Sequence, residues 1–162
     1  MAEFTDKVAL VTGSSSGIGA GIAIEFARQG AKVVISGRNS EALKAVADEI
    51  KNVSPNGLEA LQIIGDFVTD LTLPQRLINK TIEHFGKLDV LVNNAGAGVP
   101  KDFITDPTIL EQYDQCFHLN VRTLLAMTHF AVPELEKTKG NIVNISSIAS
   151  IGGVSEYSFF FL

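Results

Sequence analysis

Short apolar runs alternate with amphipathic stretches along most of this chain. Five runs are almost continuously apolar, with no alternation of apolar and polar positions: Val8–Val11, Lys32–Ser36, Leu58–Ile64, Leu88–Val92 and Ile142–Ile145. Strands that are apolar on both faces are typical of a parallel sheet covered by helices on both sides. The runs therefore predict five parallel strands.

The stretches between the first four runs have the period of helices. Apolar residues that recur four positions apart mark the buried face of a helix. Such residues are Ile18, Ile22 and Phe26 within an expected helix over Ile18–Arg28, then Leu43 and Ala47, then Leu77, Thr81 and Phe85. Strands and helices in alternation predict an α/β fold, in which a doubly wound parallel sheet is built with right-handed crossovers.

A longer helix is expected from about Thr108 to Val132, because Pro133 disfavours helical backbone in the residue before it. Its apolar residues do not form a single stripe. One face carries Leu110, Tyr113, Phe117, Val121 and Leu124, while Leu119, Met127 and Phe130 fall on other faces. This distribution predicts a helix that is buried on more than one side.

A glycine-rich segment, Thr12–Gly19, joins the first predicted strand to the first predicted helix. Glycines allow a sharp turn and let the backbone approach a ligand closely. The helix N-terminus that follows attracts phosphate through its free N–H groups and its dipole. The spacing is not G-x-G-x-x-G, because residue 22 is Ile. Taken alone, the segment is equally consistent with a structural corner between strand and helix.

Composition narrows the class of protein. The 162 residues are 46% apolar and carry a formal net charge of −5, which predicts one folded domain over residues 1–162 and argues against a nucleic-acid binder. Neither a signal peptide nor a membrane-spanning run is found. With Cys116 as the single cysteine, we expect a cytoplasmic protein without an internal disulfide. The three histidines, His84, His118 and His129, have no carboxylate or cysteine partners in the sequence pattern, so no metal site is predicted.

Four motifs occur in order along the chain. They are T-G-x-x-x-G-I-G at 12–19, Asn93-Asn94-Ala95-Gly96, Asn120 in the long helix and Ser146-Ser147 after the fifth strand. Together they resemble the short-chain dehydrogenase/reductase family. The resemblance implies a seven-stranded Rossmann sheet, of which this chain supplies about five strands. It also implies NAD(P)(H)-dependent oxidoreduction of small-molecule alcohols or carbonyls.

The resemblance also implies a role for each matching residue. Gly13, Gly17 and Gly19, with Ile18 between the last two, match the diphosphate-binding turn, and Ser15 and Ser16 lie beside the adenosine. Asp66 matches the residue that contacts adenine, although Phe67 stands between it and Val68 as if inserted. Asn93, Ala95 and Gly96 match the motif that supports the central strand and lines the cofactor site. Asn120 and Ser147 match the catalytic asparagine and serine. The alternatives are that Asn120 satisfies backbone groups in a helix kink and that Ser147 only ends a strand.

The end of the second strand bears on which nicotinamide cofactor is bound. An acidic residue there would accept hydrogen bonds from the ribose 2′-hydroxyl of NAD. The chain instead has Arg38, whose guanidinium suits a 2′-phosphate. We therefore expect NADP(H) to be preferred over NAD(H). The alternative is that Arg38 is a solvated surface residue and the preference is weak.

The catalytic Tyr-x-x-x-Lys element of the family has no match. Family spacing places the tyrosine at Phe160 and the lysine at position 164. Tyr157 is the nearest tyrosine, but Phe161 stands four residues after it. The sequence thus predicts a truncated member that lacks the C-terminal catalytic and substrate portion and is inactive. The alternatives are a slow enzyme that uses Tyr157, or a non-catalytic nucleotide-binding module that forms a homo-oligomer through the long helix.

Overall fold

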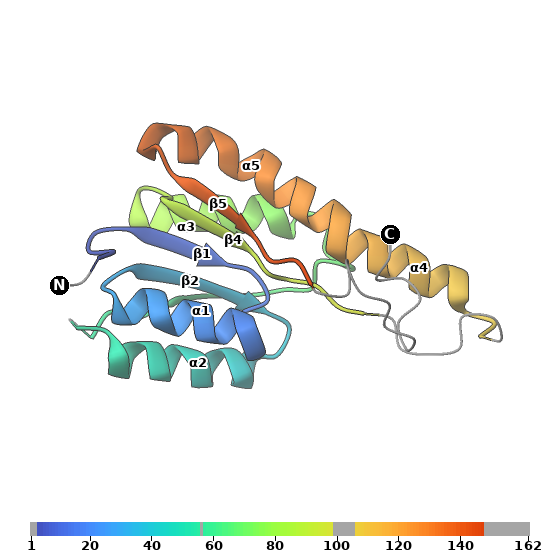
Figure 1. Cartoon of the computed structure of the whole chain (residues 1–162), viewed down its shortest axis with the longest axis horizontal. Coiled ribbons are helices and arrows are strands. Elements are labelled where there is room, and N and C mark those ends of the chain that lie inside the picture. Colours follow the sequence, from blue (N-terminus) through green and yellow to red (C-terminus); the bar gives the residue numbers. More distant parts are fainter. Residues whose placement is uncertain (1–2, 56, 99–105, 148–162) are drawn as a thin grey trace.

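The computed structural model describes residues 3–55, 57–98 and 106–147. Five strands form one parallel sheet in the order β3-β2-β1-β4-β5 (Figure 1). The strands are β1 (Val8–Val11), β2 (Lys32–Gly37), β3 (Leu61–Ile64), β4 (Val90–Asn93) and β5 (Asn141–Asn144). The chain moves outward from β1 to β3 and then returns to place β4 beside β1. This reversal makes the β1–β4 boundary the point where doubly wound sheets bind ligands, and the predicted α/β fold is confirmed.

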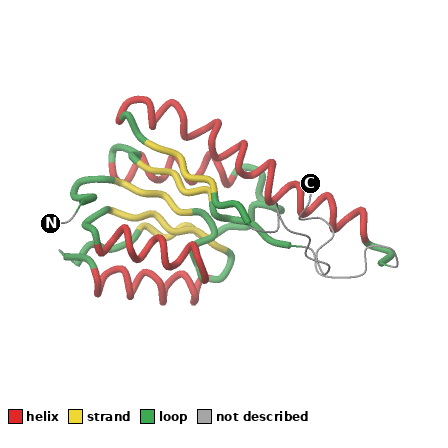
Figure 2. Tube along the Cα trace, viewed as in Figure 1, coloured by secondary structure: helices red, strands yellow, loops and turns green. Residues whose placement is uncertain are grey.

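Helices cover both faces of the sheet (Figure 2). The helices α1 (Gly17–Arg28) and α2 (Ser40–Val53) pack on one face, while α3 (Leu73–Phe85) and α5 (Thr123–Thr138) pack on the other. Successive residues of β1 serve opposite faces: Ala9 and Val11 pack with α1 and α2, and Leu10 packs with α3 and α5. Two-sided burial explains why β1, β2 and β4 are almost wholly apolar, whereas most residues of β3 and β5 are not buried.

The third strand is shorter than its apolar run predicts. It begins at Leu61 and not at Leu58. The backbone N–H of Leu58 donates to Oγ of Ser54 at 3.2 Å, and the carboxylate of Glu59 pairs with Nζ of Lys51 at 2.6 Å. These contacts hold the segment to the end of α2, so it does not join the sheet.

The long helix is one rod made of three segments, α4 (Ile109–Phe117), the π-helical turn η1 (His118–Arg122) and α5 (Figure 1). The prediction that it ends before Pro133 is wrong, because α5 continues to Thr138. Pro133 is exposed, so the carbonyl that its ring leaves without a donor can be hydrated. Leu135 beyond it is buried in the core, which holds the last turn in place.

The prediction that the long helix is buried on more than one side is also wrong. Its buried face is a narrow stripe of residues four apart in α5: Thr123, Met127, Ala131 and Leu135. Leu119 and Phe130 are only partly buried against the core, and other apolar side chains of the rod are exposed, including Leu110 at 76% and Leu125 at 61% of their areas. Many of the apolar residues that suggest burial on several sides of the helix are therefore exposed, and no described residue covers this surface.

Candidate functional site

The glycine-rich segment makes a tight turn between β1 and α1. Gly13 and Gly17 have φ values of +64° and +57°, a region that side chains disfavour. A Cβ on Gly13 would lie 2.8 Å from Cα of Ala95, so the turn packs directly on the backbone after β4. A Cβ on Gly17 would meet nothing within 4 Å, which leaves the helix entrance open. The first turn of α1 contains no acidic residue, so its N–H groups can receive an anion.

Two polar side chains lock this turn to the end of β4. Oγ1 of Thr12 accepts hydrogen bonds from the backbone N–H groups of Asn94 and Ala95, both at 3.0 Å. The side-chain amide of Asn94 donates to the carbonyls of Thr12 and Gly13 at 2.9 and 3.1 Å. Neither Thr12 nor Asn94 is among the residues assigned a role from the sequence. The signal for them is present, since both stand inside the two motifs that they join.

Asn93 lies at the end of β4 and is buried. Its amide nitrogen donates to Oδ1 of Asn144 on β5 at 2.9 Å and to Oγ1 of Thr128 on α5 at 3.3 Å. The strand register sets Asn93 directly opposite Asn144. Oδ1 of Asn93 has no hydrogen-bond partner among the residues that the structure describes. It is a buried acceptor beside a cleft, and a water molecule or a bound ligand would satisfy it.

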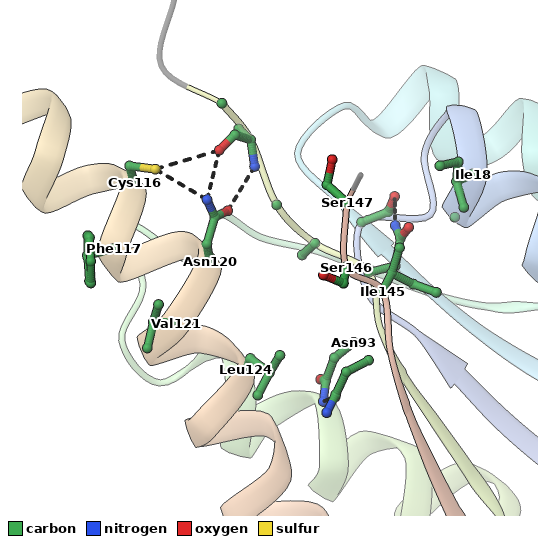
Figure 3. A pocket seen from close by; sticks show the side chains of 18 of the residues that line it. Ile18, Asn93, Cys116, Phe117, Asn120, Val121, Leu124, Ile145, Ser146 and Ser147 are labelled. Atoms are coloured by element: carbon green, nitrogen blue, oxygen red, sulfur yellow. Dashed lines mark hydrogen bonds between the residues drawn. The ribbon is translucent and has the colours of Figure 1, made fainter. Parts of the chain in front are cut away.

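Asn120 lies in the π-helical turn, where the widened helix turns its side chain toward the loop after β4. Its Oδ1 accepts from the backbone N–H of Ala97 at 3.0 Å and its Nδ2 donates to the carbonyl of Ala97 at 2.9 Å. The same Nδ2 contacts Sγ of Cys116 at 3.2 Å (Figure 3). Burial raises the pKa of the Cys116 thiol, while this contact lowers it in part. Asn120 thus satisfies backbone groups of the loop after β4, while its catalytic role stays a prediction.

A cleft of about 770 Å³ brings most of the predicted residues together. Asn120 on the long helix and Ser147 after β5 both line it (Figure 3). Its lining includes the predicted residues Gly13, Ser16, Ile18, Gly19, Asn93, Ala95, Gly96, Asn120 and Ser147. Four other predicted residues, Ser15, Gly17, Arg38 and Asp66, lie outside this lining. Tyr157, Phe160 and Phe161 lie outside the described residues.

Arg38 and Asp66 come together where β2 and β3 end. A Cβ on Gly37 would lie 2.8 Å from the side chain of Ser15, so the end of β2 touches the glycine-rich turn. Arg38 follows and is exposed, and its guanidinium lies 3.7 Å from the carboxylate of Asp66. The next side chain, Asn39, caps α2 by accepting from the N–H of Ala42 at 3.0 Å. Arg38 is thus an exposed cationic side chain at the end of β2, where a ligand bound beside the glycine-rich turn could contact it.

These features fit a dinucleotide. Gly13 packs on the backbone of Ala95, and the open position at Gly17 leaves the backbone of the turn accessible. The free N–H groups at the N-terminus of α1 are therefore available to a diphosphate.

Over the described ranges, no group of three His, Cys, Asp or Glu side chains is placed to hold a metal ion. The helices in that part of the chain are also too short or too polar to cross a membrane.

Comparison with known proteins identifies the family. The model of the short chain dehydrogenase family matches residues 7–160. The 11-beta-hydroxysteroid dehydrogenase-like 2 of Arabidopsis thaliana is 40% identical over 148 residues, which cover 91% of this chain and 46% of that protein. An oxidoreductase of Thermotoga maritima is 40% identical over 152 residues, 93% of this chain and 57% of that protein. The chain therefore spans about half the length of the curated relatives it matches.

A solved structure supports the same relationship. A short-chain dehydrogenase/reductase from Caenorhabditis elegans, determined with cofactor, superposes with a TM-score of 0.84 at 38% identity, over 98% of this chain and 59% of that chain. Its likeness covers the sheet, the turn and the cleft described above. On its sequence, its fold and the arrangement of its motifs, this chain belongs to the short-chain dehydrogenase family.

Proposed function

We propose that this chain is the cofactor-binding part of an NADP(H)-dependent oxidoreductase that acts on a small-molecule alcohol or carbonyl. The observation that carries the proposal is the cleft itself, where the glycine-rich turn, the end of β4, Asn120 and Ser147 meet. When bound, the nicotinamide cofactor supplies or accepts the hydride. The backbone of the glycine-rich turn binds the diphosphate of the cofactor. Asn120 fixes the loop after β4, which lines the same cleft, through its two hydrogen bonds to the backbone of Ala97.

Ser147 is proposed to contact the reacting oxygen. Hydride transfer to a carbonyl leaves negative charge on this atom, and a hydroxyl donor placed beforehand stabilises that charge. Ser147 follows β5 and lines the same cleft as Asn120. The family match at residues 146–147 supports the assignment.

Proton transfer to the reacting oxygen needs an acid or base, and the 162 residues contain no tyrosine with a lysine four positions after it. An unperturbed tyrosine, with a pKa near 10, needs a neighbouring cation to act at neutral pH. The two tyrosines are followed four residues later by Phe117 and Phe161, not by lysine. We therefore propose that the 162 residues alone bind cofactor without measurable turnover.

The preference for NADP(H) rests on Arg38. Its guanidinium is exposed at the end of β2 beside Ser15, where it can pair with a 2′-phosphate. A relative of the same fold, 7 alpha-hydroxysteroid dehydrogenase at 35% identity, is complexed with NADH. The fold by itself therefore does not exclude NAD(H), and the proposed preference rests on the side chain at position 38.

Fluorescence titration with NADPH and with NADH tests the preference. In the Arg38→Asp variant, the affinity for NADPH should fall relative to the affinity for NADH by about tenfold or more. This is the effect of losing one charge-assisted hydrogen bond and adding a repulsion. Arg28→Asp is the matched control, because Arg28 is an exposed arginine of α1 that pairs with Glu25. An unchanged ratio of affinities in Arg38→Asp would contradict the preference, and oxidation of NADPH by a panel of carbonyls would contradict the lack of turnover.

A second candidate function is a non-catalytic module that associates through the long helix. The exposed apolar residues of that helix are the observation in its favour. Retained cofactor binding with a defined oligomer and no turnover would support it. A cytoplasmic location stays a prediction from composition.

A further inference from the structure

The ion pair between Arg38 and Asp66 joins two strands at the adenosine end of the proposed site. Nη1 of Arg38 lies 3.7 Å from Oδ2 of Asp66. This separation is beyond hydrogen-bond length, so the two charges attract each other without locking the guanidinium in one position. Arg38 has 77% of its side chain exposed, compared with 30% for Asp66. The arginine is therefore free to turn, and the carboxylate is the fixed partner.

The orientation of Asp66 is set by its own backbone. Its Oδ1 accepts a hydrogen bond from the N–H of Val68 at 2.8 Å, which leaves Oδ2 directed at Arg38. The backbone N–H of Gly65 donates to the carbonyl of Gly37 at 3.1 Å, so the two strand ends that carry the charges are joined. The sheet thus fixes the backbone positions of Arg38 and Asp66 relative to each other, while the guanidinium of Arg38 can still turn.

We infer that Asp66 is a specificity-determining residue that acts through Arg38 and limits the preference for NADP(H). This inference rests on the proposed role of Arg38. A 2′-phosphate must draw the guanidinium away from Asp66 or share it, and it brings negative charge near a fixed carboxylate. A 2′-hydroxyl does neither, so the ion pair persists when NAD(H) binds. Asp66 therefore weakens the binding of NADP(H) more than the binding of NAD(H).

The expected effect is modest because the pair is exposed and loose. Exposed ion pairs contribute little and are screened by salt. Removing the charge of Asp66 should raise the ratio of NADPH affinity to NADH affinity by about two- to fivefold, which is the range measured for such pairs. The ratio is the useful quantity, because any contact of Asp66 with adenine is common to both cofactors and cancels.

The test is a double-mutant cycle measured by titration with NADPH and NADH at low and high salt. Asp66→Asn keeps the acceptor for Val68 and removes only the charge. Asp48→Asn is the matched control, since Asp48 is an exposed carboxylate of α2 paired with Lys44. Both changes are repeated in an Arg38→Ala background. Affinity for NADH reports whether each variant keeps an intact site.

The inference predicts a higher NADPH to NADH ratio in Asp66→Asn, a smaller increase at high salt, and little increase in the Arg38→Ala background. It is overturned if the ratio is unchanged or falls, or if the increase is equal with and without Arg38. A failure of the proposed preference looks different, because Arg38→Ala by itself would then leave the ratio unaltered. Loss of binding by the unmodified chain would overturn the proposed function as well.

Discussion

Buried and half-buried polar side chains hold the ends of the central strands in register. At the carboxyl end, Thr12 and Asn94 join the glycine-rich turn to the loop after β4. At the amino end, the buried carboxylate of Asp89 accepts from the N–H of Val8 at 2.9 Å and pairs with Lys7 and Lys87, each at 3.0 Å. Each of these side chains satisfies backbone groups that would otherwise be left unpaired between strands.

Asp89 should make folding stability depend on acidic pH. Burial raises the pKa of this carboxyl, but the donors Val8, Lys87 and Lys7 outweigh burial and hold the pKa below its ordinary value of 3.8. The charged form is therefore favoured by folding, so its stabilisation is complete above pH 3.8 and is lost as the pH falls through the lower pKa of the folded state.

The variant that tests this effect is Asp89→Asn. It should lose about 1–3 kcal/mol of unfolding free energy at neutral pH, because charge-assisted bonds become neutral ones. Its stability should also fall less steeply than that of the unmodified chain as the pH falls below 3.8. Urea unfolding followed by circular dichroism measures both quantities. Equal slopes for the two proteins would show that Asp89 does not carry the dependence.

At the scale of elements, the apolar runs predict the five strands because apolar residues dominate each run, although only β1, β2 and β4 are buried on both faces. Other features depend on contacts that no local pattern shows. The start of β3 depends on contacts of Leu58 and Glu59 with α2. The continuation of α5 beyond Pro133 depends on the burial of Leu135. In the candidate site, the motifs point to the turn and to Asn120, but not to the ion pair of Arg38 with Asp66.

The uncovered surface of the long helix belongs to this scale. We predict that the chain self-associates through it, since Val121, Leu125 and Val132 expose 42%, 61% and 37% of their areas along one rod. Leu125→Lys should shift sedimentation toward the monomer, because it places a charge inside the apolar contact. Leu71→Lys is the control, as Leu71 is equally exposed at 61% but precedes α3. Identical sedimentation of all three proteins would rule out this interface.

At the scale of the whole molecule, the strand order decides where the chemistry lies. Because β4 returns to the side of β1 and β5 follows it, the carboxyl ends of these three strands meet at one edge. The glycine-rich turn, the Asn93–Gly96 motif and Ser147 lie at those ends, and the long helix adds Asn120 beside the same edge (Figure 3). Motifs that are far apart in the sequence therefore form one cleft, as doubly wound sheets arrange them.

Hydrogen exchange of the 162-residue chain with and without NADPH is the most direct test that this cleft binds the cofactor. The account predicts slower exchange of the backbone amides of residues 13–19 and 94–97, because the first group binds the diphosphate and the second packs against it. Amides at the start of β1, on the opposite edge of the sheet, should change little. Saturating NADPH that leaves residues 13–19 unprotected, or that protects only another part of the chain, would contradict the assignment of the site.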